Sequence, residues 1–270
     1  MTEDNPRSVV GGDPWSKLRR YTPARIALGH SGTSLPTKPH LEFQLAHALA
    51  RDAVHHPLDA PALAAQLQSL GHDPVMLESR AENRPTYLQR PDKGRRLAEG
   101  SIEKLKSLPK PSAPYDVVFV ICDGLSALAI EENAVKFLDV MLTSLAGSDW
   151  HIAPLCIVKE GRVAIGDEIG EILNAALVAV LIGERPGLSS PDSMGLYMTM
   201  NPRVGLTDES RNCISNVRPA GLSYEEASHK LGYLMNEARR RGFSGVMLKD
   251  EAEALPQVGQ VPASNFLTKD

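Results

Sequence analysis

The sequence lacks the features that mark several large classes of protein. No apolar run reaches the roughly 18 residues that a membrane span needs, and the first twenty residues contain no apolar core of a signal peptide. Only three cysteines are present, Cys122, Cys156 and Cys213, and an odd number cannot form a complete disulfide framework. We therefore expect a soluble, cytoplasmic chain whose thiols are free and which has no contact with a membrane.

The sequence also has little net charge and lacks several familiar motifs. The net charge of −4 and the isoelectric point near 6.1 give no general attraction to nucleic acid. No Cys-x-x-Cys pair or His-Glu-x-x-His frame is present, so we expect no metal ligand in this chain. A phosphate-binding Gly-x-x-x-x-Gly-Lys loop, a three-glycine dinucleotide fingerprint and a Gly-x-Ser-x-Gly elbow are also missing. The sequence therefore contains no complete catalytic constellation.

The first third of the chain is predicted to be mostly helical. Residues 1–13 are polar, contain a Gly-Gly pair, and are expected to form a flexible tail. Residues 14–112 follow as a small helical region, in which the apolar residues Leu41, Leu45, Leu49 and Ala53 recur every fourth position and mark one helix face. The expected elements are a helix over 41–54, a short helix from Asp59 to Gly71, a helical stretch over 93–108 and a possible short strand over 24–28.

A proline-rich segment at 109–114 separates this region from residues 113–270. The run Val117–Ile121 is typical of a strand buried on both faces. Strands alternate with helices after it, which predicts an α/β fold with an open, doubly wound, mostly parallel, Rossmann-like sheet. The expected strands are 117–121, 152–158, 177–182 and 195–200, with helices over 125–145 and 165–174. A last helix begins at a Ser223–Glu226 capping box and ends at Gly242.

Ligands in such sheets bind beyond the carboxyl ends of the strands, and this rule selects three segments. Asp123 and Ser126 follow the first strand, where they either face a ligand or cap the next helix. Glu184 and Arg185 lie inside Gly183–Gly187 after the third predicted strand. Since an exposed ion pair contributes little stability, this tight charged loop favours a binding role over a structural one.

The third segment and a basic cluster give weaker indications of a ligand site. Cys213 is by itself most often a small buried apolar residue, although Ser215 and Asn216 beside it could line a polar pocket. A basic cluster is interpreted as a solvated face or subunit contact, with a phosphate contact as the alternative; it comprises Arg90, Lys93, Arg95 and Arg96.

These segments and several others stand in an order and spacing that resembles one known family. The landmarks are Leu18–Arg25, Tyr87–Leu97, Asp123–Ser126, Asp167–Leu173, Gly183–Leu188 and Cys213–Asn216. Over nearly the whole chain after residue 13, they resemble the small subunit of adenosylcobalamin-dependent ethanolamine ammonia-lyase.

The resemblance implies a lyase that converts ethanolamine to acetaldehyde and ammonia through a 5′-deoxyadenosyl radical. The family's large subunit, a TIM barrel, binds ethanolamine, and the small subunit holds the cobalamin from below in a large hetero-oligomer. By the match, Val163, Glu184 and Cys213 contact the cofactor, and no residue of this chain is catalytic. Further candidate contacts are Asp123, Ser126, Arg185 and Asn216.

The match also has consequences for the cobalt and for location. The Asp-x-His-x-x-Gly motif of base-off cobalamin enzymes is absent, so the cobalamin is expected to be base-on, with cobalt not ligated by this chain. Few residues precede Trp15, which argues against the extension that directs longer relatives to a bacterial microcompartment. His30 stands where many relatives carry arginine.

Two alternatives come from other functional classes. One is a stand-alone α/β enzyme acting on a nucleotide or small phosphorylated substrate around Asp123, Ser126 and Glu184. The other is a non-catalytic cobalamin-binding protein. Activity of the isolated chain and the presence of a large-subunit partner separate these alternatives from the lyase subunit.

Overall fold

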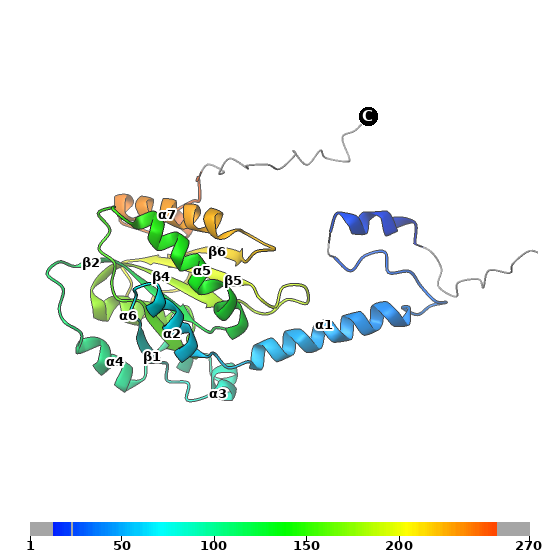
Figure 1. Cartoon of the computed structure of the whole chain (residues 1–270), viewed down its shortest axis with the longest axis horizontal. Coiled ribbons are helices and arrows are strands. Elements are labelled where there is room, and N and C mark those ends of the chain that lie inside the picture. Colours follow the sequence, from blue (N-terminus) through cyan, green and yellow to red (C-terminus); the bar gives the residue numbers. More distant parts are fainter. Residues whose placement is uncertain (1–12, 23, 253–270) are drawn as a thin grey trace, which may run out of the picture.

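A computed structural model describes residues 13–22 and 24–252. The tail predicted over 1–13 lies outside these residues except for Asp13, whose carboxylate accepts a hydrogen bond of 2.8 Å from Trp15 N and caps the short 3-10 helix η1 (Pro14–Arg20). The helix α1 (Thr37–His55) follows and projects from the rest of the fold, with its carboxyl end nearer the sheet (Figure 1).

A single six-stranded sheet forms the centre of the molecule (Figure 1). Its strands are β1 (Val75–Glu78), β2 (Tyr115–Cys122), β3 (Cys156–Lys159), β4 (Ala175–Gly183), β5 (Met194–Met200) and β6 (Arg211–Val217). Their order is β1-β3-β2-β4-β5-β6, parallel as far as β4 and antiparallel from β4 to β6. The prediction of an α/β fold with a mostly parallel sheet is confirmed.

Helices cover both faces of this sheet because the strands are apolar on both sides. Along β2, Val117 and Phe119 belong to one core and Val118 and Val120 to the other, as the two-residue period of a strand requires. The first core is formed with α2 (Ala60–Ser69), α5 (Ala127–Leu145) and α7 (Tyr224–Arg241), and the second with α4 (Glu99–Lys106) and α6 (Ile165–Leu173).

Most helix ends are where the sequence predicts them. Ser223 and Glu226 form the reciprocal capping box of α7, and Gly242 ends that helix in the left-handed conformation, with φ of 80°. Asp59 caps α2 by accepting a 3.0 Å hydrogen bond from Ala62 N. The stretch expected as one helix over 93–108 is instead a 3-10 turn, η2 (Lys93–Arg95), followed by α4.

Several strand predictions were wrong. Residues 24–28 form no strand, and Ala27 has a φ of 51°, which extended backbone does not allow. The strand expected over 152–158 is reduced to β3, with Ile152 in an isolated bridge. β5 pairs with β4 antiparallel, not parallel as expected, because residues 184–193 are too few for a crossover helix.

β1 and β6 were missed. β1 pairs with β3 although it precedes the proline-rich segment 109–114, so the boundary predicted at 112/113 does not coincide with the edge of the sheet. β6 begins at Arg211, whose guanidinium forms a two-pronged ion pair of 2.7 and 2.8 Å with Asp167 of α6. Both side chains are only 2% exposed, so this pair joins α6 to the antiparallel half of the sheet.

The segment 244–248 is attached to β6 by one side chain of that strand. Asn212 accepts a 2.7 Å hydrogen bond from Gly245 N and donates one of 2.8 Å to Leu248 O. These contacts attach the turn η4 (Gly245–Met247) to the last strand. The side-chain amide of Asn212 therefore satisfies two backbone groups of this turn.

Candidate functional site

The carboxyl ends of β2, β3 and β4 meet at one edge of the sheet, where the chain passes to opposite sides of β2. β2 is followed by Asp123, β3 by Glu160 and Gly161, and β4 by Glu184. Such a point of reversal leaves room beyond the strand ends for a ligand. Two of the three segments selected from the sequence therefore lie beside each other.

Two glycines let these strand ends approach closely. Gly124 has a φ of 59°, and a Cβ on it would collide with the backbone of Gly183. A Cβ on Gly183 would in turn collide with the carbonyls of Asp123 and Ser126. Leu125 N donates a 2.9 Å hydrogen bond to Gly183 O, which fixes the contact. Both positions therefore require glycine for steric reasons.

Asp123 and Ser126 support this edge from within the protein. Asp123 accepts hydrogen bonds of 3.0 and 3.1 Å from Glu160 N and Gly161 N. Burial, reinforced by the nearby Glu160 carboxylate and opposed by Arg84, raises the pKa of Asp123 to about 7. Ser126 is fully buried and caps α5 by accepting a 3.2 Å hydrogen bond from Ala129 N, as the capping alternative predicted.

Two arginines enclose the ring of Tyr87. The guanidinium carbons of Arg84 and Arg162 lie 4.8 and 4.1 Å from the ring centroid. Tyr87 donates through its hydroxyl to Gly161 O at 3.2 Å. Arg162 Nε is buried and has no hydrogen-bond partner among the described residues. Val163, next in the chain, is half-buried against the second core.

Glu184 is held by polar groups from two other segments. Its carboxylate accepts hydrogen bonds from the hydroxyls of Ser193 and Ser215, and one of 3.2 Å from Asn216 N. No ion pair joins it to Arg185 within the described part of the chain. Glu184 and Arg185 therefore do not neutralise each other, and the Glu184 carboxylate is oriented by its hydrogen-bond donors.

Cys213 lies on the open face of β6, opposite Tyr197 of β5. The two side chains share a hydrogen bond, and the thiol is exposed instead of buried in apolar surroundings. Partial desolvation and the Glu184 carboxylate raise the pKa of Cys213 above its usual range, although the hydrogen bond to Tyr197 opposes the shift. At neutral pH this cysteine is therefore a neutral thiol and a poor nucleophile.

A hollow of about 420 Å³ connects these groups. It brings together Glu184 and Arg185, predicted from the sequence, with Tyr87, Gly124, Leu125, Arg162, Ile182, Gly183, Tyr197 and Ser215. Cys213 touches this set through Tyr197, and Val163 adjoins it through Arg162. Ser126 and Asp123 lie behind its wall. The hollow is open, lined by both polar and apolar groups, and too small to enclose a macrocyclic cofactor by itself.

Four of the contributing side chains were not selected from the sequence pattern. Tyr87 and Arg162 come from segments selected only through the family resemblance, and Ser193 is an isolated serine in a loop. Tyr197 alone could have been found, because it is the single aromatic side chain in a strand of otherwise small and aliphatic residues. Its position on the open face follows from the two-residue period.

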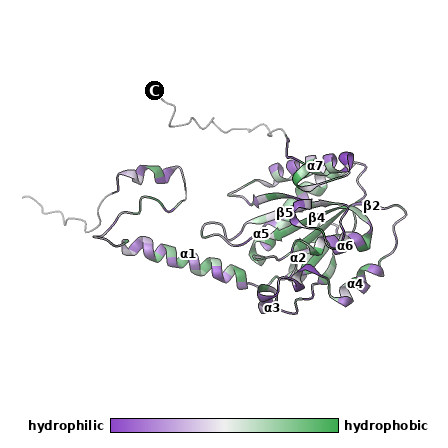
Figure 2. Cartoon of the chain, turned by 180° about the vertical axis from the view of Figure 1, so that it is seen from behind, coloured by the Kyte–Doolittle hydropathy of each residue, from purple (hydrophilic) through white to green (hydrophobic). Residues whose placement is uncertain are grey.

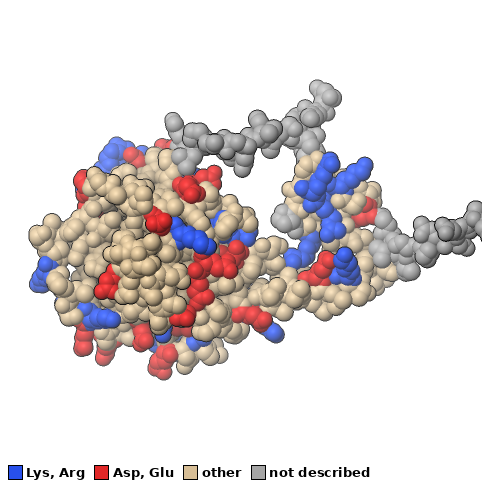
Figure 3. Space-filling view, in the orientation of Figure 1, with Lys and Arg blue, Asp and Glu red and all other residues tan. Residues whose placement is uncertain are grey.

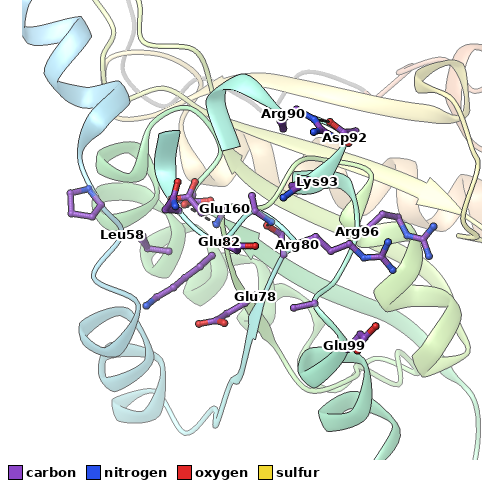
Figure 4. Close-up of a pocket in the computed structure, with 17 residues that line it drawn as sticks. Leu58, Glu78, Arg80, Glu82, Arg90, Asp92, Lys93, Arg96, Glu99 and Glu160 are labelled. Atoms are coloured by element: carbon purple, nitrogen blue, oxygen red, sulfur yellow. Dashed lines mark hydrogen bonds and ion pairs between the residues drawn. The ribbon is translucent and has the colours of Figure 1, made fainter. Parts of the chain in front are cut away.

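A larger cleft of about 1090 Å³ lies on the other side of Asp123 (Figure 4). Acidic and basic side chains line it in nearly equal number, among them Arg80, Glu82, Lys93 and Glu160. Arg96, from the basic cluster, forms a two-pronged ion pair of 3.1 and 2.8 Å with Glu168. The Arg96 side chain is 39% exposed, and the ion pair already occupies two of its donors.

The described residues lack both a membrane-length apolar helix and a cluster of metal-ligating side chains. No helix there is both long and apolar enough to cross a membrane. Within 13–22 and 24–252, no three His, Cys, Asp or Glu side chains are grouped so that they could hold a metal ion.

Comparison with known proteins gives a consistent match. A family model described as ethanolamine ammonia-lyase light chain (EutC) matches residues 12–249. Proteins called ethanolamine ammonia-lyase small subunit are 56% identical over 264 residues in Azotobacter vinelandii, covering 97% of both chains, and 54% identical over 272 residues in Pseudomonas aeruginosa, covering 99% of this chain and 98% of the relative. One from Xanthomonas campestris pv. campestris is 56% identical over 261 residues, covering 94% and 96%.

Proposed function

The chain belongs to the ethanolamine ammonia-lyase light-chain family, and we propose that it is the subunit that holds cobalamin against a large subunit carrying the ethanolamine site. The observation that carries the proposal is the oriented Glu184 carboxylate in an open hollow at the strand ends. No catalytic constellation accompanies it among the described residues, which suits a subunit that binds and positions.

The residues at the hollow suit the chemistry of a corrinoid. Amide side chains and ribose hydroxyls at the rim of such a cofactor are hydrogen-bond donors, and an ionised carboxylate is their strongest acceptor. Glu184 is pre-oriented by Ser193 and Ser215, so little conformational freedom is lost when it binds. The unpartnered Nε of Arg162 is a buried donor that needs an acceptor, such as a cofactor carbonyl.

The residues proposed to bind cobalamin have different roles. Val163 supplies apolar contact and its backbone, Glu184 accepts hydrogen bonds, and Cys213 adds shape beside Tyr197. Arg185 and Asn216 flank Glu184, while Asp123 and Ser126 keep the glycine-packed edge rigid. Adenosylcobalamin, when bound, supplies the radical that starts deamination. The residues of this chain hold it in place and shield one face from water.

An open hollow of this size also supports the proposed division of labour. Ligand sites commonly bury most of their ligand, and about 420 Å³ leaves most of a corrin uncovered. A second subunit must therefore supply the remaining walls, including those that exclude water from the reacting face. The proposal places ethanolamine wholly on that partner.

Co-expression with the large subunit from the same organism tests the proposal. The complex should release acetaldehyde from ethanolamine only when adenosylcobalamin is added, and the isolated chain should release none. Turnover by the isolated chain would instead support a stand-alone enzyme, for which the charged cleft in Figure 4 would be the first candidate site. A complex that forms but neither binds cobalamin nor turns over ethanolamine would refute the proposal.

A further inference from the structure

Helix α1 carries a leucine stripe, defined as Leu41, Leu45 and Leu49, that nothing in the described chain covers. Residues four apart share one face of a helix, so these side chains form a continuous row. They are 56%, 62% and 54% exposed. Hydrophobic and hydrophilic residues alternate visibly along this helix (Figure 2). An exposed apolar row on a helix is typical of a surface that packs against another element.

The contacts of α1 with its own chain are made by small residues of its carboxyl half. Ala53, four residues after Leu49, is the one buried residue among its 19, and Ala46 and Ala50 are half-buried. Near the carboxyl end, Arg84 Nε donates a 2.7 Å hydrogen bond to Val54 O. The helix is therefore attached at one end by small residues, and its three leucines stay exposed.

Such a helix gains little stability from its own chain. Most helical stability in proteins comes from packing of the apolar face and not from the intrinsic preference of the residues for helix. Here the three leucines are exposed, and the helix stands apart from the sheet and the helices that cover it (Figure 1). A functional assembly that buries the leucine stripe would supply the missing packing.

The segment before α1 links this helix to the candidate site. Arg25 donates hydrogen bonds to Ser189 and Leu188, in the loop that follows Glu184. η1 adds basic side chains in its last turn, Lys17, Arg19 and Arg20, which contribute to the positive cluster visible in Figure 3. A partner that closes the hollow at Glu184 can thus extend along the N-terminal segment to the leucine stripe.

We infer that the leucine stripe docks in an apolar groove of the large subunit, whose rim is acidic where it meets η1. The inference rests on the proposed function, because relatives named small subunit imply a larger companion. A second copy of this chain could also bury the stripe, but it would leave the hollow open. The large subunit accounts for both surfaces.

The test replaces Leu41, Leu45 and Leu49 together by alanine. Because these side chains are exposed and alanine favours helix, the isolated chain should keep its circular dichroism spectrum and melting temperature. Gln44, His47 and Arg51, all exposed on another side of α1, are replaced by alanine as the matched control. Affinity for the purified large subunit is measured by biolayer interferometry, and self-association by analytical ultracentrifugation.

We expect the leucine variant to bind the large subunit at least about a hundredfold more weakly, while the control variant changes less than about threefold. Equal binding by wild type and leucine variant would overturn the inference and leave the proposed function intact. Leucine-dependent dimers of the chain with unchanged large-subunit binding would overturn it in favour of a second copy. If the wild-type chain did not bind the large subunit at all, the proposed function itself would fail.

Discussion

Replacing Glu184 by glutamine tests the centre of the proposed site with almost no change in shape. The carboxylate accepts three hydrogen bonds within the chain, from Ser193, Ser215 and Asn216 N. Glutamine keeps one acceptor oxygen but presents an amide donor in place of the other. Serine hydroxyls can turn to accept from that amide, whereas the backbone donor of Asn216 cannot.

The expected loss follows from the charge. A hydrogen bond to an ionised group contributes about 1.5–3 kcal/mol, about twice the value for a neutral pair. Loss of one such bond to the cofactor should weaken cobalamin binding by about ten- to a hundredfold. Folding should lose only about 1 kcal/mol, because the remaining polar partners can still pair.

The assay is a titration of the two-subunit complex with cobalamin, followed by its visible absorption. Asp192→Asn is the matched control, because this carboxylate lies in the same loop but pairs with Arg218 at 3.1 Å outside the hollow. Its affinity for cobalamin should equal that of wild type. An unchanged dissociation constant in a folded, assembled Glu184→Gln complex would refute the reasoning and remove Glu184 from the site.

Three further predictions concern other groups. Cys213→Ser should keep most of its turnover at saturating cobalamin, because a hydroxyl can replace the hydrogen bond to the neighbouring tyrosine; a loss of several orders of magnitude would make the thiol a chemical participant. Since the pKa of Asp123 is about 7 in the fold and about 3.9 when unfolded, its contribution to stability should be complete below pH 4 and be lost as the pH rises to 7. In urea unfolding, the free energy of unfolding of Asp123→Asn should fall less steeply between pH 4 and pH 7 than that of wild type. Equal pH dependence in the two proteins would contradict the raised pKa of Asp123. Asp167→Asn leaves the buried Arg211 charge half-paired and should cost about 3–5 kcal/mol of unfolding free energy, against less than about 1 kcal/mol for Asp208→Asn, whose exposed carboxylate also meets Arg211; similar losses would show that burial does not control this pair.

The sequence predicted the parallel half of the sheet better than the antiparallel half. β2 and β4 are long apolar runs because both faces are covered, and such runs are readily recognised. β6 has one open face, so Cys213, Ser215 and Asn216 gave it the appearance of a polar loop. β1 has only four residues and ends in Glu78, which leaves too short a pattern to detect.

The residues of the candidate site that directly follow a strand could be predicted from the sequence. Glu184 and Gly124 follow buried strands directly, so the rule for α/β sheets finds them. Ser193 and Ser215 reach Glu184 from loops and strands whose pairing is set by long-range contacts, and local patterns contain no information on that pairing. The exposed leucine stripe of α1 was predicted as a helical face, but its exposure could only be seen in the structure.

The position of β6 at the edge of the sheet also bears on how the chain behaves before it meets a partner. An unpaired edge strand invites a strand from another molecule, and repeated addition leads to aggregates. Here the turn that follows β6 folds back on the end of the strand, where Leu222 N donates a 2.8 Å hydrogen bond to Asn216 O and Arg218 N donates one of 3.1 Å to Leu222 O. The same hydrogen bonds that end the strand therefore leave less of its edge open to pairing between newly made chains.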